Sequence, residues 1–214
     1  MNTFGLYIHI PFCEKKCPYC DFYSGTPLKN DIEEYTAGVI NRLVSYAEIY
    51  SGRVIDTVYF GGGTPNLIGA ENLKRILASA KTLFSVTADA EITIEVNPGS
   101  VSADFFDAIY SAGFNRLSLG LQSANADELE LLGRRHSRND VETAVRSAQA
   151  AGFGNISLDL MIGLPKQTEE SIRKSIEFCA SMGVQHVSSY ILKIEENTVF
   201  HRKLEPQTLS VRKT

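Results

Sequence analysis

The sequence predicts an α/β protein whose parallel strands form a partial (β/α)6 TIM-like barrel, and two features support this fold class. First, short apolar segments alternate six times with segments of helical periodicity, which is typical of a parallel sheet covered by helices. Right-handed crossovers fit either an open doubly wound sheet or a curved barrel. Second, polar residues or glycines stand at or near the ends of successive strands, and they converge if the sheet curls, which favours the barrel. These residues are Cys13, Gly62, Glu95, Gln122 and Asp159.

The strands and helices are expected in strict alternation. The expected strands are apolar along most of their length and cover 6–10, 54–60, 91–96, 117–121, 156–162 and 187–192. The expected helices carry apolar residues at helical spacing and cover 29–50, 70–84, 102–112, 126–132, 141–151 and 169–182. Several helices begin at a residue whose side chain is able to cap the first turn, and several end at a glycine. The caps are Asn30 or Asp31, Ser102, Ser137 in a capping box with Asp140, and Thr168; the glycines are Gly113, Gly152 and Gly183.

The composition indicates a soluble globular protein. Hydrophobic residues make up 43% of the chain and charged residues 21%, which are ordinary values. The net charge of −4 argues against a general nucleic-acid surface, and no apolar run approaches the ~20 residues of a membrane span. Three of the four cysteines share one loop, which does not suit a disulfide framework and favours the reducing cytoplasm. We expect one domain over 1–200, followed by a tail over 201–214 without clear strand or helix character.

The three clustered cysteines follow the first expected strand. Cys13, Cys17 and Cys20 have C-x3-C-x2-C spacing, and Pro11 and Pro18 prevent a helix from spanning them. Thiolates so close together favour a soft metal. A structural zinc ion takes four protein ligands, whereas an iron–sulfur cubane accepts three and leaves one iron free for a ligand. The first interpretation is a cluster that binds a cofactor or substrate directly. The alternatives are a zinc loop with a more distant fourth ligand, or three inert core thiols.

The cysteine motif and its surroundings resemble those of a known family. The spacing of the cysteines, followed by the aromatic Phe22, resembles the radical S-adenosylmethionine (SAM) superfamily. The segment YIHIPF at 7–12 resembles one branch of it, which holds the oxygen-independent coproporphyrinogen III oxidases and the heme chaperones similar to them. This resemblance, which extends over nearly the whole chain, implies a 4Fe-4S cluster on Cys13, Cys17 and Cys20. It also implies SAM on the open iron, where reductive cleavage would yield methionine and a 5′-deoxyadenosyl radical.

Further residues suit the chemistry of SAM. The turn GGGTP at 61–65 allows a ligand to approach the backbone closely, although a plain strand-to-helix turn would look the same. Glu95 is costly to bury without a partner such as an ammonium group, and Gln122 and Asp159 offer acceptors to ribose hydroxyls. Arg134 is able to clamp a carboxylate, although alone it would be taken for a solvated charge at a helix end. By the resemblance, the SAM contacts are Tyr7, Phe22, Gly62, Gly63, Thr64, Glu95, Gln122, Arg134 and Asp159.

The resemblance also separates two functions. The oxidases carry a fourth cysteine at the position of Phe22 and an N-terminal extension, and this sequence has neither, which favours the heme-chaperone branch. The implied ligand is heme or a porphyrin as cargo, with an electron donor such as flavodoxin or ferredoxin. The alternatives are a coproporphyrinogen oxidase, which performs an oxidative decarboxylation, and a truncated, inactive barrel. Both branches continue into a C-terminal domain that covers the barrel mouth, and no counterpart is expected within these residues.

The remaining histidines and the fourth cysteine carry no predicted function. His136 and His201 are expected to face solvent, and His186 has no visible partner. His9 alternates with Tyr7 in the first strand, which would allow it to face the site, but it is interpreted as a packed strand residue. Cys179 lies among apolar residues of a helix and is interpreted as part of the core. If the loop bound zinc instead of a cluster, His9 and Cys179 would be the candidate fourth ligands.

Overall fold

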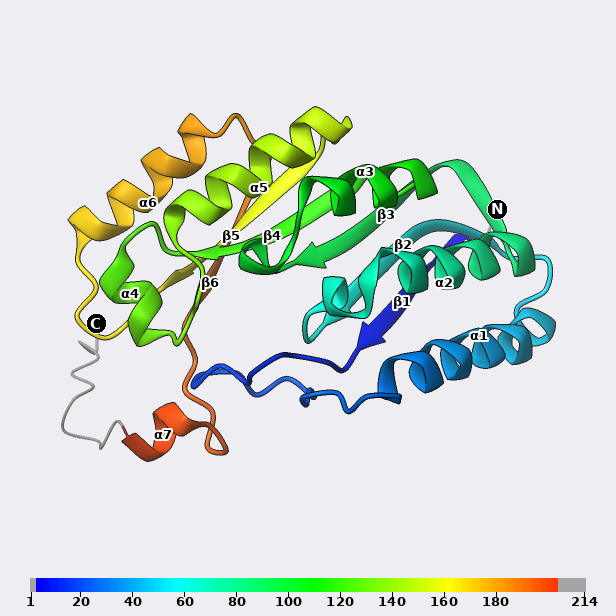
Figure 1. Ribbon diagram of the computed structural model, residues 1–214, viewed down its shortest axis with the longest axis horizontal. Helices are drawn as coiled ribbons and strands as arrows, with labels where there is room; N and C mark the ends of the chain where they lie inside the picture. The colour runs from blue at the N-terminus through cyan, green and yellow to red at the C-terminus, as the bar shows by residue number, and fades with distance from the viewer. Residues whose placement is uncertain (1–2, 204–214) are drawn as a thin grey trace.

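The six strands form one parallel sheet in which each strand pairs only with its neighbours in the chain. The computed structural model describes residues 3–203, and its sheet order is β1-β2-β3-β4-β5-β6. A doubly wound sheet would reverse its strand order at a switch point, so this order confirms the predicted partial barrel. The sheet curls into a half-barrel (Figure 1). The strands are β1 Thr3–Ile10, β2 Val54–Gly62, β3 Ser85–Val96, β4 Arg116–Gln122, β5 Ile156–Ile162 and β6 His186–Ile191.

The helices follow the strands and lie along the convex side of the sheet (Figure 1). The longer ones are α1 Asp31–Ile49, α2 Gly69–Leu83, α3 Ala103–Ala112, α5 Arg138–Ala151 and α6 Glu169–Ser181. The short elements are α4 Ala126–Leu131, α7 Val199–Lys203 and the 3-10 turns η1 Pro65–Ile68 and η2 Pro98–Ser100. Within 3–203, none of these helices has both the length and the hydropathy that a membrane crossing requires.

The predicted caps of three helices are confirmed, although α5 begins directly after its cap, at Arg138 rather than at the predicted 141. The Ser102 hydroxyl accepts a hydrogen bond from the Phe105 amide, and Ser137 forms a reciprocal capping box with Asp140. Thr168 caps α6 in the same way, with Ser171 as its reciprocal partner. The prediction for α1 was only partly right, because Asn30 occupies the cap position without a side-chain hydrogen bond there.

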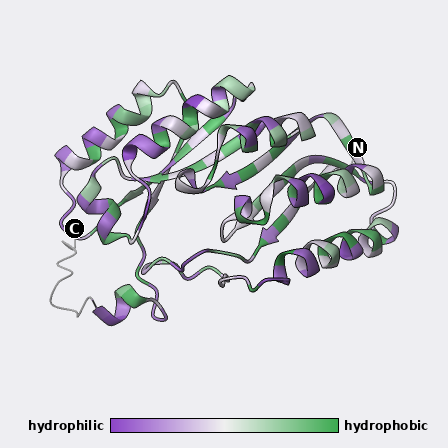
Figure 2. Ribbon diagram, in the orientation of Figure 1, coloured by the Kyte–Doolittle hydropathy of each residue, from purple (hydrophilic) through white to green (hydrophobic). Residues whose placement is uncertain are grey.

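The core lies between the sheet and the helices. Its largest fully buried side chains include Phe60, Phe106 and Phe114, and Figure 2 shows hydrophobic strands facing the apolar sides of the helices. Successive strand residues point to opposite faces, so Leu117 and Leu119 enter this core while Ser118 between them faces the concave side. The concave face is therefore the polar face, and it is available for a ligand.

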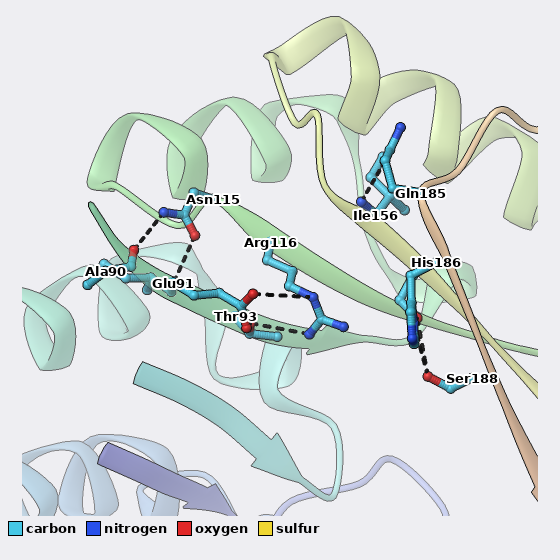
Figure 3. Close-up of polar contacts among 11 residues, drawn as sticks. Ala90, Glu91, Thr93, Asn115, Arg116, Ile156, Gln185, His186 and Ser188 are labelled. Carbon is cyan, nitrogen blue, oxygen red and sulfur yellow. Dashed lines mark hydrogen bonds and ion pairs between the residues drawn. The ribbon is translucent and has the colours of Figure 1, made fainter. Parts of the chain in front are cut away.

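Polar side chains join neighbouring strands near their beginnings (Figure 3). The Asn115 side chain accepts from the Ile92 amide at 2.7 Å and donates to the Ala90 carbonyl at 2.8 Å. His186 was expected to lack a partner, and that prediction is wrong. Its Nδ1 lies 2.8 Å from the Ser157 hydroxyl of the adjacent strand. These contacts fix β3 against β4 and β5 against β6 at the end of the sheet opposite the barrel mouth.

The C-terminal part of the described chain packs on the cysteine loop. Residues from 201 onward were expected to lack helix character, but 201–203 belong to α7, and 204–214 lie outside the described residues. Phe200 of α7 is buried, its amide donates to the Pro18 carbonyl at 2.9 Å, and its ring centroid lies 6.2 Å from that of Tyr19. The domain boundary at 200 remains a prediction.

Candidate functional site

The cysteine loop is closed by backbone hydrogen bonds at its base. The Cys13 amide donates to the Gly25 carbonyl, and the Gly25 amide donates to the Pro11 carbonyl, both at 2.9 Å. Between these points the chain is irregular, as the prolines predict, with one turn in which the Cys20 amide donates to the Cys17 carbonyl at 3.1 Å. The three cysteines are free and partly exposed. The loop is thus anchored at both ends while its thiols face the mouth region.

The thiols of this loop suit a multinuclear metal centre. Burial raises the pKa of Cys20, and the neighbouring thiols of Cys17 and Cys13 raise it further, while the Phe22 amide partly offsets the rise. A bound cation would offset this unfavourable effect on the Cys20 thiolate. Within 3–203, no three Cys, His, Asp or Glu side chains converge closely enough to hold a single ion. A cluster does not need such convergence, because its cysteines bind different irons.

The glycine turn after β2 lies directly against the start of the cysteine loop. The Gly63 amide donates to the Ile10 carbonyl and the Thr64 amide donates to the Phe12 carbonyl, both at 2.7 Å. A Cβ atom at Gly63 would lie 2.5 Å from the Phe12 carbonyl oxygen, so only glycine fits at this approach. The Thr64 hydroxyl lies 3.5 Å from the Cys13 sulfur. The turn and the start of the loop are therefore joined in one hydrogen-bonded unit.

Glu95 joins this unit from β3. Its carboxylate accepts from the Gly62 amide at 3.0 Å and from the Tyr59 hydroxyl at 2.8 Å. Burial raises the pKa of Glu95, and these two hydrogen bonds only partly offset the effect. Among residues 3–203, no Lys or Arg forms an ion pair with the Glu95 carboxylate, although the nearby His9 partly lowers its pKa. The carboxylate is thus poised to receive an ammonium group from a ligand.

We expect Glu95→Gln to weaken SAM binding without lowering the stability of the ligand-free protein. The amide oxygen can accept from the Gly62 amide while the NH2 group donates to the Tyr59 hydroxyl oxygen, which reverses the direction of that one hydrogen bond. Both contacts are thus retained, and the charge that would pair with the SAM ammonium is lost. A charge-assisted contact is worth about 1.5–3 kcal/mol, which corresponds to an affinity about 10- to 100-fold lower by calorimetry. Burial raises the pKa of Glu95, so the carboxyl takes up a proton at a pH above the ordinary carboxyl range. The SAM affinity of the parent should therefore fall as the pH is lowered through that higher range. The variant should lose this pH dependence; if it keeps it, another group binds the ammonium.

Arg134 is not a solvated charge at a helix end. Its guanidinium lies 5.8 Å from the Tyr19 ring centroid, and Nη2 donates to the Tyr19 hydroxyl at 2.6 Å. Its Nε is buried and has no hydrogen-bond partner among residues 3–203. The neighbouring Arg135 is exposed and pairs with Glu14 at 2.7 Å. Arg134 alone thus presents a free donor inside the site, which fits the carboxylate predicted to bind there.

Gln122 and Asp159 lie at different depths. Gln122 ends β4 and is buried at the mouth, where a Cβ atom at Gly120 would lie 2.9 Å from its Nε2 and 3.9 Å from Nη2 of Arg134. Asp159 lies in the middle of β5 rather than at its end, and its two oxygens accept from the Ser118 hydroxyl at 2.9 and 3.0 Å. Burial raises the pKa of Asp159. Gln122 is therefore grouped with Arg134, while Asp159 lies deeper on the concave face.

The two aromatic residues predicted to contact SAM are exposed. Tyr7 stacks on Tyr59 with ring centroids 6.0 Å apart, and its hydroxyl lies 3.0 Å from Nδ1 of His9. Phe22 is 65% exposed on the cysteine loop. His9, interpreted from the sequence as a packed residue, is half-buried on the site side, and its Nε2 lies 2.9 Å from the Tyr23 carbonyl oxygen. The rings of Tyr7 and Phe22 are therefore open to stacking by an aromatic group of a ligand.

Two tyrosines of the site were missed in the sequence. Tyr59 holds the Glu95 carboxylate, and Tyr19 holds the Arg134 guanidinium. Tyr59 stands two positions before Gly61, so strand alternation from the glycine turn would have placed it on the concave face. Tyr19 lies between two cysteines in an irregular loop, where no strand or helix periodicity indicates the direction in which its side chain points.

Of the remaining predictions for histidine and cysteine residues, two are confirmed and one is wrong. Cys179 is 1% exposed in the core, and His201 is exposed, as predicted. His136 was predicted to face solvent, and this is wrong. It is 5% exposed and its Nε2 lies 3.0 Å from the Leu121 carbonyl oxygen. The run of charged residues around it gave the wrong impression, because the chain turns inward at this one position.

Comparison with known proteins identifies the class to which this fold and site belong. The model of the radical SAM superfamily matches residues 7–179. The chain therefore belongs to the radical SAM superfamily, as the three cysteines and the half-barrel indicated.

Within the superfamily, the chain is similar to curated heme chaperones. It is 40% identical over 198 residues to the heme chaperone HemW of Escherichia coli, covering 92% of this chain and 52% of that protein. It is 37% identical to the heme chaperone HemW of Bacillus subtilis, covering 93% and 53% of the two chains. The predicted resemblance to this branch is confirmed. The chain spans about half the length of the curated relatives it matches.

Solved structures show the same half-barrel. The coproporphyrinogen III oxidase HemN of Escherichia coli, a radical SAM enzyme, superimposes with a TM-score of 0.88 at 30% identity over 96% of this chain and 48% of that chain. The methyltransferase TsrM of Kitasatospora setae, with cobalamin and a 4Fe-4S cluster bound, has a TM-score of 0.62 at 15% identity over 91% of this chain and 35% of that chain. The second likeness concerns the fold alone.

Proposed function

We propose that this chain is the cluster- and SAM-binding barrel of a heme-handling radical SAM protein. One observation carries the proposal: the Glu95 carboxylate is bound to the Gly62 amide, and the same glycine turn is bound to the start of the cysteine loop. A ligand held by Glu95 would therefore lie beside the cluster. The 4Fe-4S cluster, on Cys13, Cys17 and Cys20, would supply the electron that cleaves the sulfonium bond of SAM.

The residues of the chain divide the binding of SAM between them. Glu95 would hold the ammonium group, and Arg134, with its free Nε, would hold the carboxylate. Gln122 and Asp159 would accept hydrogen bonds from the ribose hydroxyls. The remaining proposed contacts provide close backbone approach and aromatic cover, and they are Gly62, Gly63, Thr64, Tyr7 and Phe22.

Heme is the proposed cargo. Its support is the similarity to proteins named heme chaperones, together with Phe22 at the position where the oxidases of the branch carry a cysteine. A reduced flavodoxin or ferredoxin would supply electrons, and the free thiols suit the cytoplasm. Coproporphyrinogen III oxidation is a second candidate, because the solved oxidase superimposes closely. A barrel that binds heme without cleaving SAM is a third.

Anaerobic assays of the reconstituted protein separate these candidates. We expect heme to bind when titrated, as monitored by its absorbance spectrum, and we expect SAM to be cleaved to methionine and 5′-deoxyadenosine when dithionite is present. Formation of protoporphyrinogen from coproporphyrinogen III would instead identify an oxidase. Heme binding without SAM cleavage would favour the inactive barrel. A protein that binds neither heme nor SAM would contradict the proposal.

A further inference from the structure

The strand β4 ends in a strained turn at Gln122. Gln122 has a φ of 67°, in the left-handed region that residues other than glycine rarely adopt. Across it, the Ser123 amide donates to the Leu121 carbonyl at 2.9 Å, which closes a three-residue γ-turn. The pairing of β4 with β5 also shifts register between Leu119 and Gln122. Such strain persists only where the surrounding structure enforces it.

His136 is placed to enforce this turn. Its Nε2 lies 3.0 Å from the Leu121 carbonyl oxygen, the same oxygen that accepts from Ser123. Because a carbonyl only accepts, Nε2 must carry the proton. On its other side, His136 lies against η2. A Cβ atom added at Gly99 would lie 2.9 Å from the Cβ atom of His136. The Cα and Cβ atoms of His136 are thus held against η2 while the imidazole reaches the Leu121 carbonyl.

The hydrogen bond, rather than packing, distinguishes this histidine from an apolar residue. Nδ1 of His136 is buried without a hydrogen-bond partner within 3–203, which is unfavourable. An apolar side chain of similar size would avoid that cost but would leave the Leu121 carbonyl with only the strained contact from Ser123. The imidazole therefore contributes one thing that an apolar residue lacks, which is a donor to the turn.

The direction of this turn determines where the Gln122 amide lies. The Gln122 side chain sits over Gly120, next to the guanidinium of Arg134, as the approach of both groups to the Gly120 Cβ position indicates. Strand alternation alone already places Gln122 on the concave face with Ser118 and Gly120. The γ-turn sets the direction of the Gln122 Cα–Cβ bond on that face, so a relaxed turn would move the amide from its place over Gly120 beside Arg134.

We propose that His136 is a positioning residue for SAM, which holds the Leu121 carbonyl and thereby directs Gln122 toward the ligand without touching the ligand itself. This inference rests on the proposed function. It assigns a role in the site to a residue outside the set of contacts implied by the family resemblance.

The test compares two substitutions of His136 in the cluster-loaded protein. His136→Leu removes the donor, and we expect SAM affinity to fall about tenfold by calorimetry and the Ser123 amide to exchange its hydrogen faster. His136→Gln places an amide N–H near the position of Nε2, and we expect it to restore both properties to within about threefold of the parent. His201→Leu is the matched control, because it removes a histidine whose side chain is exposed on α7, and it should change neither readout.

Each outcome bears on the inference. Parent-like SAM affinity in His136→Leu would overturn it, as would an equal loss in His136→Gln, since the histidine would then only fill space. If His136→Leu does not fold, Gly99→Ala tests the same contact, because its new methyl group would lie 2.9 Å from the His136 Cβ. It must therefore push His136, with its imidazole intact, away from the Leu121 carbonyl, and it should reproduce both effects. If the parent itself binds no SAM, the proposed function fails. Slow exchange of the Ser123 amide that depends on His136 would still show that His136 holds the turn.

Discussion

Replacing Cys20 with alanine should abolish cluster assembly. The three cysteines are the thiols that the loop provides in the described chain, and a cubane held by two thiolates would lack the support that the motif supplies. Anaerobic reconstitution of the parent should give a brown protein with broad absorbance near ~400 nm and about four irons per chain. The variant should remain colourless and should not bind SAM, because the open iron is missing.

Cys179→Ala is the control for this experiment. Cys179 is a buried thiol of α6 that lies in the hydrophobic core, so its loss removes a sulfur without touching the loop. We expect full cluster content, with stability lower by about 1 kcal/mol because of the small cavity. Zinc as the sole metal of the parent, at full occupancy, would contradict the cluster and would turn the loop into a structural site.

Replacing Gly62 with valine should abolish SAM binding. Gly62 has a φ of 116°, which a β-branched residue does not adopt without strain, and its Cβ would lie 2.7 Å from the His9 ring and 2.9 Å from the Ile10 carbonyl oxygen. The turn would have to shift, and the Gly62 amide would leave the Glu95 carboxylate that it now binds at 3.0 Å. We expect SAM affinity to fall by about 100-fold or more in equilibrium dialysis.

The cluster should survive this change, because all three thiols remain in the loop. Iron content and visible absorbance should therefore match the parent. Gly38→Ala provides the control: this glycine lies inside α1, a Cβ atom there would meet nothing within 4 Å, and alanine favours the helix. Tight SAM binding by the Gly62 variant would show that the glycine turn does not contact the ligand.

The fold was predictable because its signals are local. Caps such as Ser102, Ser137 and Thr168 define helix starts within four residues of sequence, and the alternation of apolar strands with helices defines the class. The choice between an open sheet and a half-barrel depended on which polar strand ends meet. The observed strand order, with each strand beside its neighbour in the chain, decided it.

The candidate site was predictable only in part. Its cysteines and glycines are recognised by spacing and by backbone requirements, and these are properties of a short segment. The predicted strand 156–162 matches β5, so the mid-strand position of Asp159 followed from the sequence. Its hydrogen bonds from Ser118 were not predictable, because they join two strands that are 41 positions apart in the chain.

The sequence by itself therefore determined the α/β class, the three clustered thiols and the glycine turn. Tertiary structure alone decided how the charged side chains of the site are held. Tyr59 binds Glu95 across 36 positions of sequence, and Arg134 binds Tyr19 across 115. The burial of His136 against Leu121 arises in the same way. The physical reason is that a hydrogen bond between side chains depends on the path of the backbone between them, and no local pattern records that path.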